Sequence, residues 1–311
     1  MSRRVTELLY IGGVGRSGST VLEMLLHRSG HFRALGEVAI IDSPTIAEDP
    51  LCSCGERFSR CPYWSCVLAS DRLAPQQREQ GVAALRRHYR LRHYLPRLLW
   101  PRMGASAPAE LARARQYLAR LYAAAAACAP GERLLDGSKH PARALALAQT
   151  PGLQLWVLHL VRDPRAVVHS WANPKYNPGL GRPMRRYSLL VASGKWLLEN
   201  LLTELLRWRG CAVMRLRYED LVNQDAAALA RLAHFVGLDE GALRMALGAE
   251  PGAAVRSGDY HSLAGNPIRF GDQALALRRD ERFRTAMPPW RRLVVLLLTA
   301  PLALRYGYLR P

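Results

Sequence analysis

The sequence predicts an α/β fold in three layers, in which helices flank a central and mostly parallel β-sheet. Short apolar segments with strand character alternate with helical segments, and each strand candidate is followed by a helix start. Such alternation produces parallel strands joined by right-handed crossovers, so the carboxyl ends of the strands share one edge of the sheet. Ligands of parallel sheets bind at that edge, and a functional site is expected there.

The expected elements follow from local patterns. Four short apolar segments have strand character: residues 8–12, 133–136, 153–161 and 211–217. The strongest long helix is expected at 187–208. Pro141 and Pro164 suit the first position of two further helices, and Asp163 is a suitable N-cap because its carboxylate can accept from free backbone N–H groups.

We expect residues 1–311 to form a single domain. Hydrophobic residues make up 49% of the chain, which is enough apolar surface for a large core. Residues 42–130 separate the first two expected strands and contain a cysteine-rich segment and two helical patterns, at 76–94 and 109–128. This stretch is expected to be a helical insertion that covers the sheet or shapes a substrate pocket.

The chain is strongly basic, with 44 Lys and Arg residues against 25 Asp and Glu residues and a net charge of +19. Such a balance attracts anions, whether nucleic acid, an acidic membrane surface or a phosphorylated small molecule. Because the arginines are scattered through every segment, general solubility or genomic base composition explains the charge equally well. No basic stripe interleaved with aromatic residues is evident, so a nucleic-acid partner is not expected.

Both ends of the chain bear on its location. Residues 5–13 are typical of a strand and turn rather than of a secretory signal, so a cytoplasmic protein is expected. The longest apolar run, 293–304, contains Pro301 and is shorter than the ~20 residues needed to span a bilayer. We expect a buried terminal helix here, and a peripheral membrane contact flanked by Trp290 and Arg291 is the alternative.

A glycine-rich segment follows the first expected strand directly. Glycines let the backbone turn tightly, so that N–H groups and the start of the next helix can face an anion. As a dinucleotide-binding motif, the segment supplies Gly13, Gly15 and Gly18, with Glu37 about 20 residues later for a ribose. As a Walker loop it has Ser19 in place of the lysine, so ATP hydrolysis is not expected.

A third interpretation makes Arg16 a cation and Ser17, Ser19 and Thr20 hydroxyl donors to a terminal oxyanion. In this form the segment resembles the glycine loop of sulfotransferases that use 3′-phosphoadenosine 5′-phosphosulfate (PAPS). The resemblance implies a P-loop-like fold and a set of residues that bind the 5′-phosphosulfate: Gly15, Arg16, Ser17, Gly18, Ser19 and Thr20. The competing interpretation is a plain helix start, in which Thr20 and Glu23 form a capping box.

A second segment, 161–170, resembles the family's site for the 3′-phosphate. In that family an arginine ends a central strand and a serine lies eight residues later on the following helix, which implies Arg162 and Ser170 here. Asp163 would cap this helix, and Ser170 falls seven residues later near the same helix face. Neither a dehydrogenase nor a kinase explains this segment, so the two segments together favour the sulfotransferase interpretation.

Three further residues resemble the family at single positions. Lys139 follows an expected strand, where the family commonly has a lysine that acts on the transferred group. Tyr218 lies in a Tyr-Glu-Asp-Leu segment, and Arg269 lies in a segment that resembles a late loop closing over the nucleotide. The alternatives are structural: a plain turn for Lys139, a core position for Tyr218 and a turn cap for Arg269.

The resemblance implies in-line transfer of a sulfuryl group from PAPS to an acceptor hydroxyl. In the branch nearest to protein-tyrosine and carbohydrate sulfotransferases, a glutamate at this distance from the loop arginine is the general base, which implies Glu37. His140 is the alternative base, and a surface ion pair is the structural alternative for Glu37. Arg16 and Lys139 would stabilise charge on the sulfuryl oxygens and the leaving phosphate.

The partners follow from this reaction. The acceptor is expected to be a small-molecule, glycan or lipid hydroxyl, and no metal cofactor is expected. The alternative function is a P-loop nucleotide-binding protein or a small-molecule kinase, which would use ATP and Mg²⁺.

Four cysteines lie close together in the sequence: Cys52, Cys54, Cys61 and Cys66. Their spacing, C-x-C-x₆-C-x₄-C, lacks the paired C-x₂-C of a structural zinc site. For a cytoplasmic chain, reduced thiols are expected first, a local disulfide second and zinc third. None of the four is expected to be catalytic.

Overall fold

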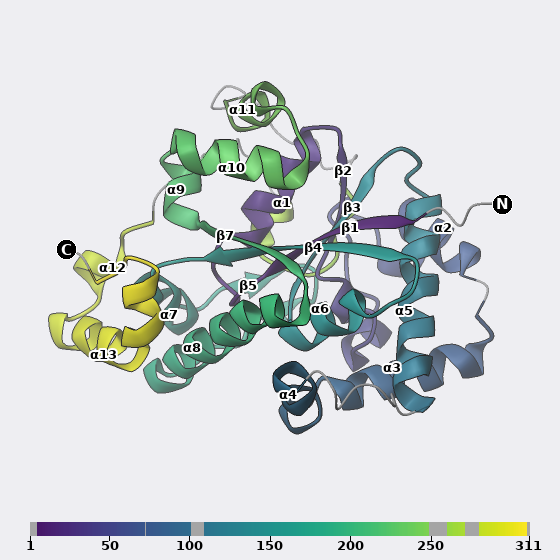
Figure 1. Cartoon of the computed structure of the whole chain (residues 1–311), viewed down its shortest axis with the longest axis horizontal. Coiled ribbons are helices and arrows are strands. Elements are labelled where there is room, and N and C mark those ends of the chain that lie inside the picture. The colour runs from purple at the N-terminus through teal and green to yellow at the C-terminus, as the bar shows by residue number, and fades with distance from the viewer. Residues whose placement is uncertain (1–4, 72, 101–108, 249–259, 271–279, 310–311) are drawn as a thin grey trace.

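Five parallel strands form the central sheet, as the sequence predicts (Figure 1). This computed structural model describes residues 5–71, 73–100, 109–248, 260–270 and 280–309. The strands, in sheet order, are β2 (Phe32–Gly36), β3 (Arg133–Lys139), β1 (Thr6–Gly12), β4 (Leu153–Val161) and β7 (Ala212–Arg217). All neighbouring strands pair in parallel, so their carboxyl ends lie along one edge.

The connections between the strands are mostly helical. The described helices are α1 (Ser19–Arg28), α2 (Pro62–Ser70), α3 (Pro75–His88), α4 (Leu91–Leu99), α5 (Ala109–Ala127), α6 (Pro141–Ala148), α7 (Pro164–Ala172), α8 (Leu189–Leu205), α9 (Tyr218–Val222), α10 (Ala226–Val236), α11 (Glu240–Gly248), α12 (Phe283–Ala286) and α13 (Pro289–Arg305). Two short strands, β5 (Tyr176–Asn177) and β6 (Arg182–Pro183), pair as a separate antiparallel ribbon. The expected long helix is confirmed as α8, and the pattern at 76–94 divides into α3 and α4.

Helices cover both faces of the sheet (Figure 1). Leu8 and Tyr10 of β1 pack on one face together with residues of α5, α6 and α8. The alternating residues Leu9 and Ile11 pack on the other face with α1 and α10. Burial of β1 on both sides is typical of a central strand in a parallel sheet.

The sequence analysis missed one strand. β2 pairs with β3 at the edge of the sheet, so residues 42–130 lie between the second and third strands and not between the first and second. The segment is only five residues long, and Phe32 is its one strong strand former, so neither length nor composition marks it.

A buried ionic network ties residues 42–130 to the sheet. Arg143 of α6 is fully buried and forms ion pairs with Asp42 and with Asp136 of β3. The Tyr117 hydroxyl of α5 donates to Asp42 at 2.6 Å. Since Asp42 and Tyr117 belong to the insertion, the network fixes the insertion against the strand that ends at the predicted site.

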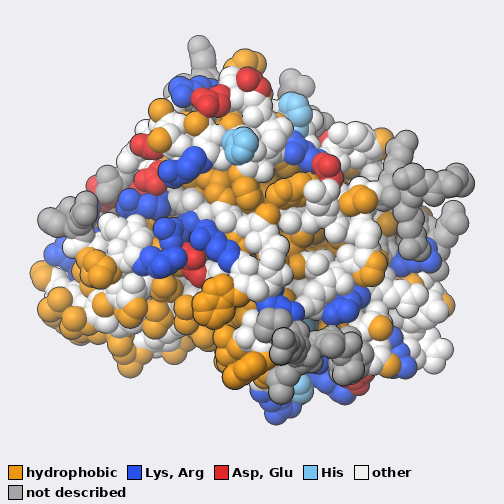
Figure 2. All heavy atoms as spheres, viewed as in Figure 1, with side chains coloured by type: hydrophobic (Ala, Val, Ile, Leu, Met, Phe, Trp, Pro, Cys, Tyr) orange, Lys and Arg blue, Asp and Glu red, His pale blue; other side chains and the backbone are white. Residues whose placement is uncertain are grey.

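The C-terminal helix α13 is half buried, whereas a buried helix was expected. Val295, Thr299 and Leu302 face the interior. The exposed apolar side chains of this helix are Trp290, Leu293, Leu297, Leu298 and Leu304. Figure 2 shows apolar side chains gathered at the lower left, over α8 and α13. Among the residues described, no helix is both long and apolar enough to cross a membrane.

Candidate active site

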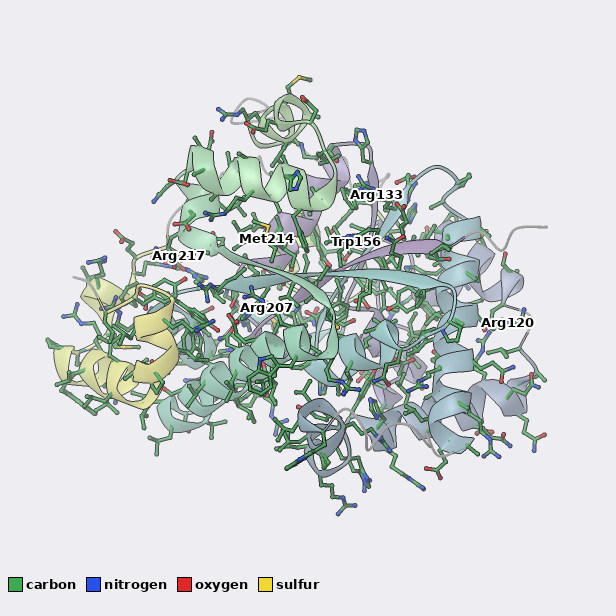
Figure 3. The ribbon with its side chains drawn as sticks, in the orientation of Figure 1. Arg120, Arg133, Trp156, Arg207, Met214 and Arg217 are labelled. Atoms are coloured by element: carbon green, nitrogen blue, oxygen red, sulfur yellow. A yellow bond between two sulfur atoms is a disulfide. The ribbon has the colours of Figure 1, made fainter. Side chains whose placement is uncertain are left out.

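The carboxyl ends of the strands bring the predicted residues to one edge of the sheet. β1 ends opposite Lys139, the last residue of β3. β4 ends immediately before Arg162, and β7 ends immediately before Tyr218. Figure 3 shows Arg217, at the end of β7, on this side of the sheet, and Arg133, at the start of β3, on the opposite side.

The glycine loop leaves the start of α1 without a side-chain cap. Gly18 is the N-cap residue, with a positive φ of 96°, and α1 begins at Ser19. A Cβ on Gly18 would lie 2.4 Å from the Tyr218 ring, so both the backbone conformation and the packing require glycine. The alternative capping box of Thr20 and Glu23 does not form. The first N–H groups of α1 therefore have no acceptor from a cap side chain and are available to bind an anion.

Arg16 and Ser17 hold buried hydrogen-bond donors close to the start of α1. Arg16 Nε, Arg16 Nη1 and the Ser17 hydroxyl find no hydrogen-bond partner within the described parts of the chain. The Arg16 guanidinium lies 4.9 Å from the Trp171 ring centroid, and its Nη2 lies 3.3 Å from Met184 Sδ. Burial lowers the pKa of Arg16 because the cation loses solvation. Unpaired buried donors are costly, so they are suited to a bound oxyanion.

Lys139 connects the glycine loop to Glu37. Its Nζ donates to Glu37 Oε1 at 2.7 Å and lies 3.3 Å from Ser19 Oγ. Lys139 has a positive φ of 67°, and Arg16 has one of 74°, which side-chain-bearing residues rarely adopt. The preceding turn is held by Asp136, whose carboxylate accepts from the Ser138 N–H at 2.8 Å. Glu37 thus pairs with a lysine of the site and not with a surface arginine.

Arg162 lies beside the glycine loop. Its Nη1 donates to the Arg16 carbonyl oxygen at 3.0 Å. Its guanidinium lies 4.8 Å from the Tyr218 ring centroid, and Asp280 lies 3.6 Å from its Nη2. The two segments that the sequence singled out therefore meet in space, although 146 residues separate the two bonded arginines.

Helix α7 continues from Arg162 and faces the loop. Asp163 caps it as predicted, since its carboxylate accepts from the Arg165 N–H at 2.8 Å. Ser170 lies two turns further along and is buried. Its neighbour Trp171 donates from Nε1 to the Gly15 carbonyl oxygen at 3.2 Å, so this turn of α7 packs on the loop.

Two predicted nucleotide contacts have mainly structural surroundings. Tyr218 is buried in the core on the α1 side of the sheet. Arg269 is 3% exposed and donates to the carbonyl oxygens of Ser262 and Leu51, at 3.0 and 3.1 Å. These surroundings are compatible with the structural alternatives, in which Tyr218 fills the core and Arg269 caps a turn, and the two nucleotide contacts stay predictions.

The alternative base, His140, faces the insertion. Its ring centroid lies 4.8 Å from that of Tyr89 and 6.2 Å from that of Tyr94. Of the two candidates, Glu37 is the one in contact with Lys139 and thereby with the glycine loop.

Glu23 is a buried carboxyl group close to Lys139, and the sequence did not predict its burial. It lies on α1 and is 3% exposed, and its Oε1 has no hydrogen-bond partner among the residues described. Burial raises its pKa to about 8, although the charge of Lys139 acts in the opposite direction. In the sequence, only the helical spacing of Glu23 relative to its apolar neighbours indicates that its side chain is buried. The predicted capping box with Thr20 accounted for a glutamate at this position equally well.

Replacing Glu23 with glutamine is expected to change the pH dependence of stability. Glu23 in the unfolded chain has a pKa near 4.5, so the folded chain binds its proton more tightly than the unfolded chain does. The free energy of unfolding therefore falls as pH rises from about 4.5 to 8. The glutamine variant stays neutral, so its advantage in unfolding free energy should grow from about zero at pH 4 towards about 5 kcal/mol at pH 9. Urea unfolding at several pH values measures this difference.

The matched control for that comparison is Glu132→Gln. Glu132 forms an ion pair with Arg33 at 2.6 Å and lies just before β3, at the other end of the sheet. An advantage of Glu23→Gln that does not change with pH would contradict the prediction.

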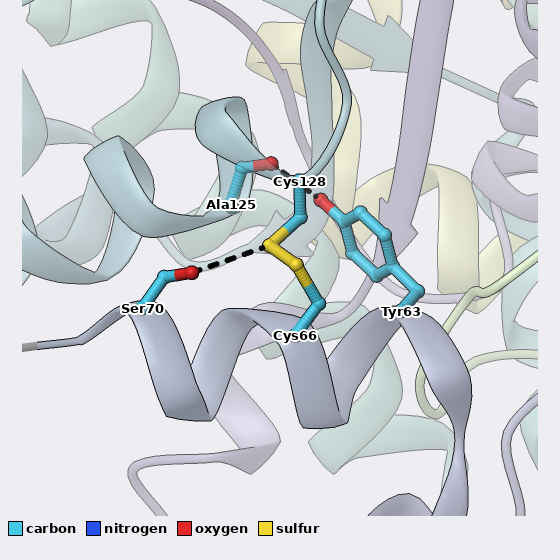
Figure 4. The surroundings of a disulfide bond; sticks show 5 residues. All are labelled: Tyr63, Cys66, Ser70, Ala125 and Cys128. Atoms are coloured by element: carbon cyan, nitrogen blue, oxygen red, sulfur yellow. Dashed lines mark hydrogen bonds between the residues drawn. A yellow bond between two sulfur atoms is a disulfide. The ribbon is translucent and has the colours of Figure 1, made fainter.

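The cysteines do not behave as one group. Cys66 of α2 forms a disulfide with Cys128, which follows α5, with a Cα–Cα distance of 6.1 Å (Figure 4). This corrects the expectation of a reduced thiol at Cys66, and the pairing is not local, since 62 residues separate the partners. Disulfides are uncommon in reducing compartments, so the bond disfavours the expected cytoplasmic location, which stays a prediction.

The other three cysteines of the segment are close to a histidine from late in the chain. Cys52, Cys54 and Cys61 are free, and their Sγ atoms and one His261 ring nitrogen all lie within 4.8 Å of one another. This cluster could hold a metal ion, which the spacing of the cysteines alone did not predict.

Comparison with known proteins agrees with the geometry of the site. None of the curated proteins compared matches the chain. The sequence profile described as "Sulfotransferase family" matches residues 9–241, about three quarters of the chain. The match covers the glycine loop, Glu37, Lys139 and the Arg162 segment. The chain therefore belongs to the sulfotransferase family, whose enzymes transfer a sulfuryl group from PAPS.

Proposed function

We propose that this enzyme transfers the sulfuryl group to an acceptor hydroxyl with Glu37 as general base. The observation that supports this most is the arrangement at the edge of the sheet. Buried donors of Arg16 and Ser17, which have no partner among the described residues, lie on the same loop as Ser19, and Lys139 links Ser19 to the Glu37 carboxylate. A group of donors beside a carboxylate can hold an oxyanion and remove a proton from an attacking hydroxyl.

The residues of the loop would act mainly through positioning and electrostatics. PAPS, when bound, supplies the sulfuryl group and a phosphate leaving group. Arg16, Lys139 and the N–H groups at the start of α1 would stabilise negative charge on those oxygens. Glu37 would orient the acceptor hydroxyl and take its proton. No step of this proposal uses a metal ion.

Arg162 and Ser170 would select the donor nucleotide by its 3′-phosphate. Arg162 is already oriented by the Arg16 carbonyl and the Tyr218 ring, so a phosphate would meet a preorganised guanidinium. Asp280 Oδ2 lies 3.6 Å from Arg162 Nη2, and a bound 3′-phosphate would compete with this carboxylate for the guanidinium.

The acceptor would be a small-molecule, glycan or lipid hydroxyl bound near the insertion. The exposed apolar side chains of α13, together with the exposed Arg291, are compatible with a peripheral contact with a membrane surface. This contact is part of the proposal because it would hold the enzyme at the membrane surface that contains a lipid acceptor.

Ligand-dependent unfolding tests the proposed donor. Adenosine 3′,5′-bisphosphate, in EDTA and without Mg²⁺, is expected to stabilise the protein by about 2.7 kcal/mol at a concentration 100 times its Kd. ATP with Mg²⁺ is expected to give much less stabilisation at the same concentration. Thermal unfolding with each ligand provides the comparison. If ATP with Mg²⁺ stabilises the protein and adenosine 3′,5′-bisphosphate does not, the kinase alternative is favoured.

A further inference from the structure

We propose that Cys52, Cys54, Cys61 and His261 bind one structural zinc ion. The proposal is independent of the proposed catalytic mechanism. It concerns a site whose residues contact the backbone next to Glu37 and the glycine loop. It also reverses the order expected from the sequence, in which reduced thiols came first and zinc last.

The distances suit tetrahedral zinc. Cys54 Sγ lies 3.7 Å from Cys61 Sγ, and Cys61 Sγ lies 3.3 Å from His261 Nδ1. With Zn–S bonds near 2.3 Å and Zn–N bonds near 2.0 Å, a tetrahedron has edges of about 3.5–3.8 Å. All four ligand atoms lie within 4.8 Å of one another, so a small contraction would complete the set.

The backbone around the cysteines is already folded as a chelating turn. The Gly55 N–H donates to the Cys52 carbonyl oxygen at 3.0 Å, and Gly55 has a positive φ of 91°. Cys61 is the N-cap residue of α2, where the helix dipole favours a thiolate. Cys52 and Cys61 are fully buried, so the ion would be shielded from solvent.

His261 is held in place from several directions. Ser53, which lies between two of the cysteines, accepts from the Ser262 N–H at 2.8 Å and donates from its N–H to the Ser262 carbonyl at 3.1 Å. The Trp64 indole donates to the His261 carbonyl at 2.9 Å, and the Tyr63 ring stacks on the imidazole at 5.7 Å. Such contacts orient a metal ligand before the metal binds.

The charge of the site also needs a partner, which Arg269 can supply. Three thiolates and a neutral imidazole around Zn²⁺ carry a net charge of −1. Arg269 is 3% exposed and forms no ion pair with any carboxylate in the described segments. Its guanidinium is bonded to the Leu51 carbonyl, next to Cys52. A buried guanidinium without a counter-charge is costly, and a nearby anionic zinc site would offset that cost.

The zinc would fix the segment that supports the general base. Residues 262–263 continue from His261 into contact with the end of β2. The Leu263 N–H donates to the Leu35 carbonyl at 2.9 Å, and the Glu37 N–H donates to the Leu263 carbonyl at 2.7 Å. Beyond it, the Asn266 N–H donates to Thr20 Oγ1 at 3.2 Å. The metal would thereby join the 52–61 turn to the backbone on which Glu37 and the glycine loop rest.

Metal analysis of the full-length, tag-free protein tests the proposal. After dialysis against metal-free buffer, we expect about one zinc per chain in the natural sequence and about one in Cys211→Ser, a free cysteine outside the cluster. Cys61→Ser is expected to retain less than about a tenth of that zinc, since a lost thiolate leaves an incomplete and weaker site. When purified from cobalt-supplemented cells, the natural sequence and Cys211→Ser should both show thiolate-to-cobalt charge-transfer absorption.

The result for the natural sequence decides the question even if Cys61→Ser fails to fold. Zinc-free protein with four titratable thiols, the three of the cluster and that of Cys211, would overturn the proposal, as would a disulfide between Cys54 and Cys61 found by mass spectrometry. Full zinc content in folded Cys61→Ser would also overturn it. Because these measurements use no nucleotide or acceptor, their failure is distinct from failure of the proposed transfer reaction.

Discussion

Replacing Glu37 with glutamine is expected to lower kcat by a factor of about 10²–10⁴, the usual contribution of a positioned general base. The amide cannot accept the proton of the acceptor hydroxyl, although it keeps the shape of the side chain. Affinity for adenosine 3′,5′-bisphosphate should change little, because Arg16, Ser17 and the start of α1 remain in place. Turnover is measured with a radiolabelled sulfuryl donor and an acceptor found by screening.

Glu132→Gln provides the matched control for that experiment. This residue also forms a carboxylate ion pair at 2.6 Å, but with Arg33, away from the glycine loop. We expect its turnover to equal that of the natural sequence. Unchanged turnover in Glu37→Gln, together with a large loss in His140→Asn, would transfer the role of base to His140.

Replacing Arg162 with alanine is expected to lower the affinity for adenosine 3′,5′-bisphosphate by about 10–100-fold. The affinity for adenosine 5′-phosphate should fall by much less. A charged hydrogen bond contributes about 1.5–3 kcal/mol, and this one would be made only to the 3′-phosphate. Isothermal titration calorimetry with both nucleotides gives the two ratios.

Arg215→Ala controls for the loss of an arginine packed on a tyrosine. Its guanidinium lies 4.7 Å from the Tyr306 ring centroid, as that of Arg162 lies 4.8 Å from Tyr218. The control should bind both nucleotides normally. Equal weakening of both nucleotides in Arg162→Ala would show that Arg162 only positions the glycine loop, through the Arg16 carbonyl.

The sheet was largely predictable because four of its strands are apolar and each precedes a clear helix start. β2 was missed because its pairing with β3, rather than its own composition, makes it a strand. The predicted insertion contains the expected helical patterns, but its attachment depends on the buried Arg143, which the sequence marks only as one arginine among many.

The site was predictable where function constrains local sequence. The glycine loop and the Arg162 segment each have a local pattern, and parallel strands bring such patterns together. His261 had no such pattern, since it lies 200 residues from Cys61. Arg269 was singled out because its loop resembles a loop of the family. The direction of its side chain depends on the carbonyl groups of Leu51 and Ser262, which only the tertiary structure brings close to it.

The left-handed backbone at Arg16 and Lys139 has a consequence for how the sequence can vary. A side chain in this conformation costs roughly 1–2 kcal/mol relative to glycine, so glycine would relieve backbone strain at either position, although at Lys139 it would also remove the ion pair with Glu37. Glycine would also remove one of the two cations that we propose stabilise charge on the sulfuryl and phosphate oxygens. Backbone strain and charge placement are therefore opposed at both residues, and selection for heat resistance alone would not protect the two cations.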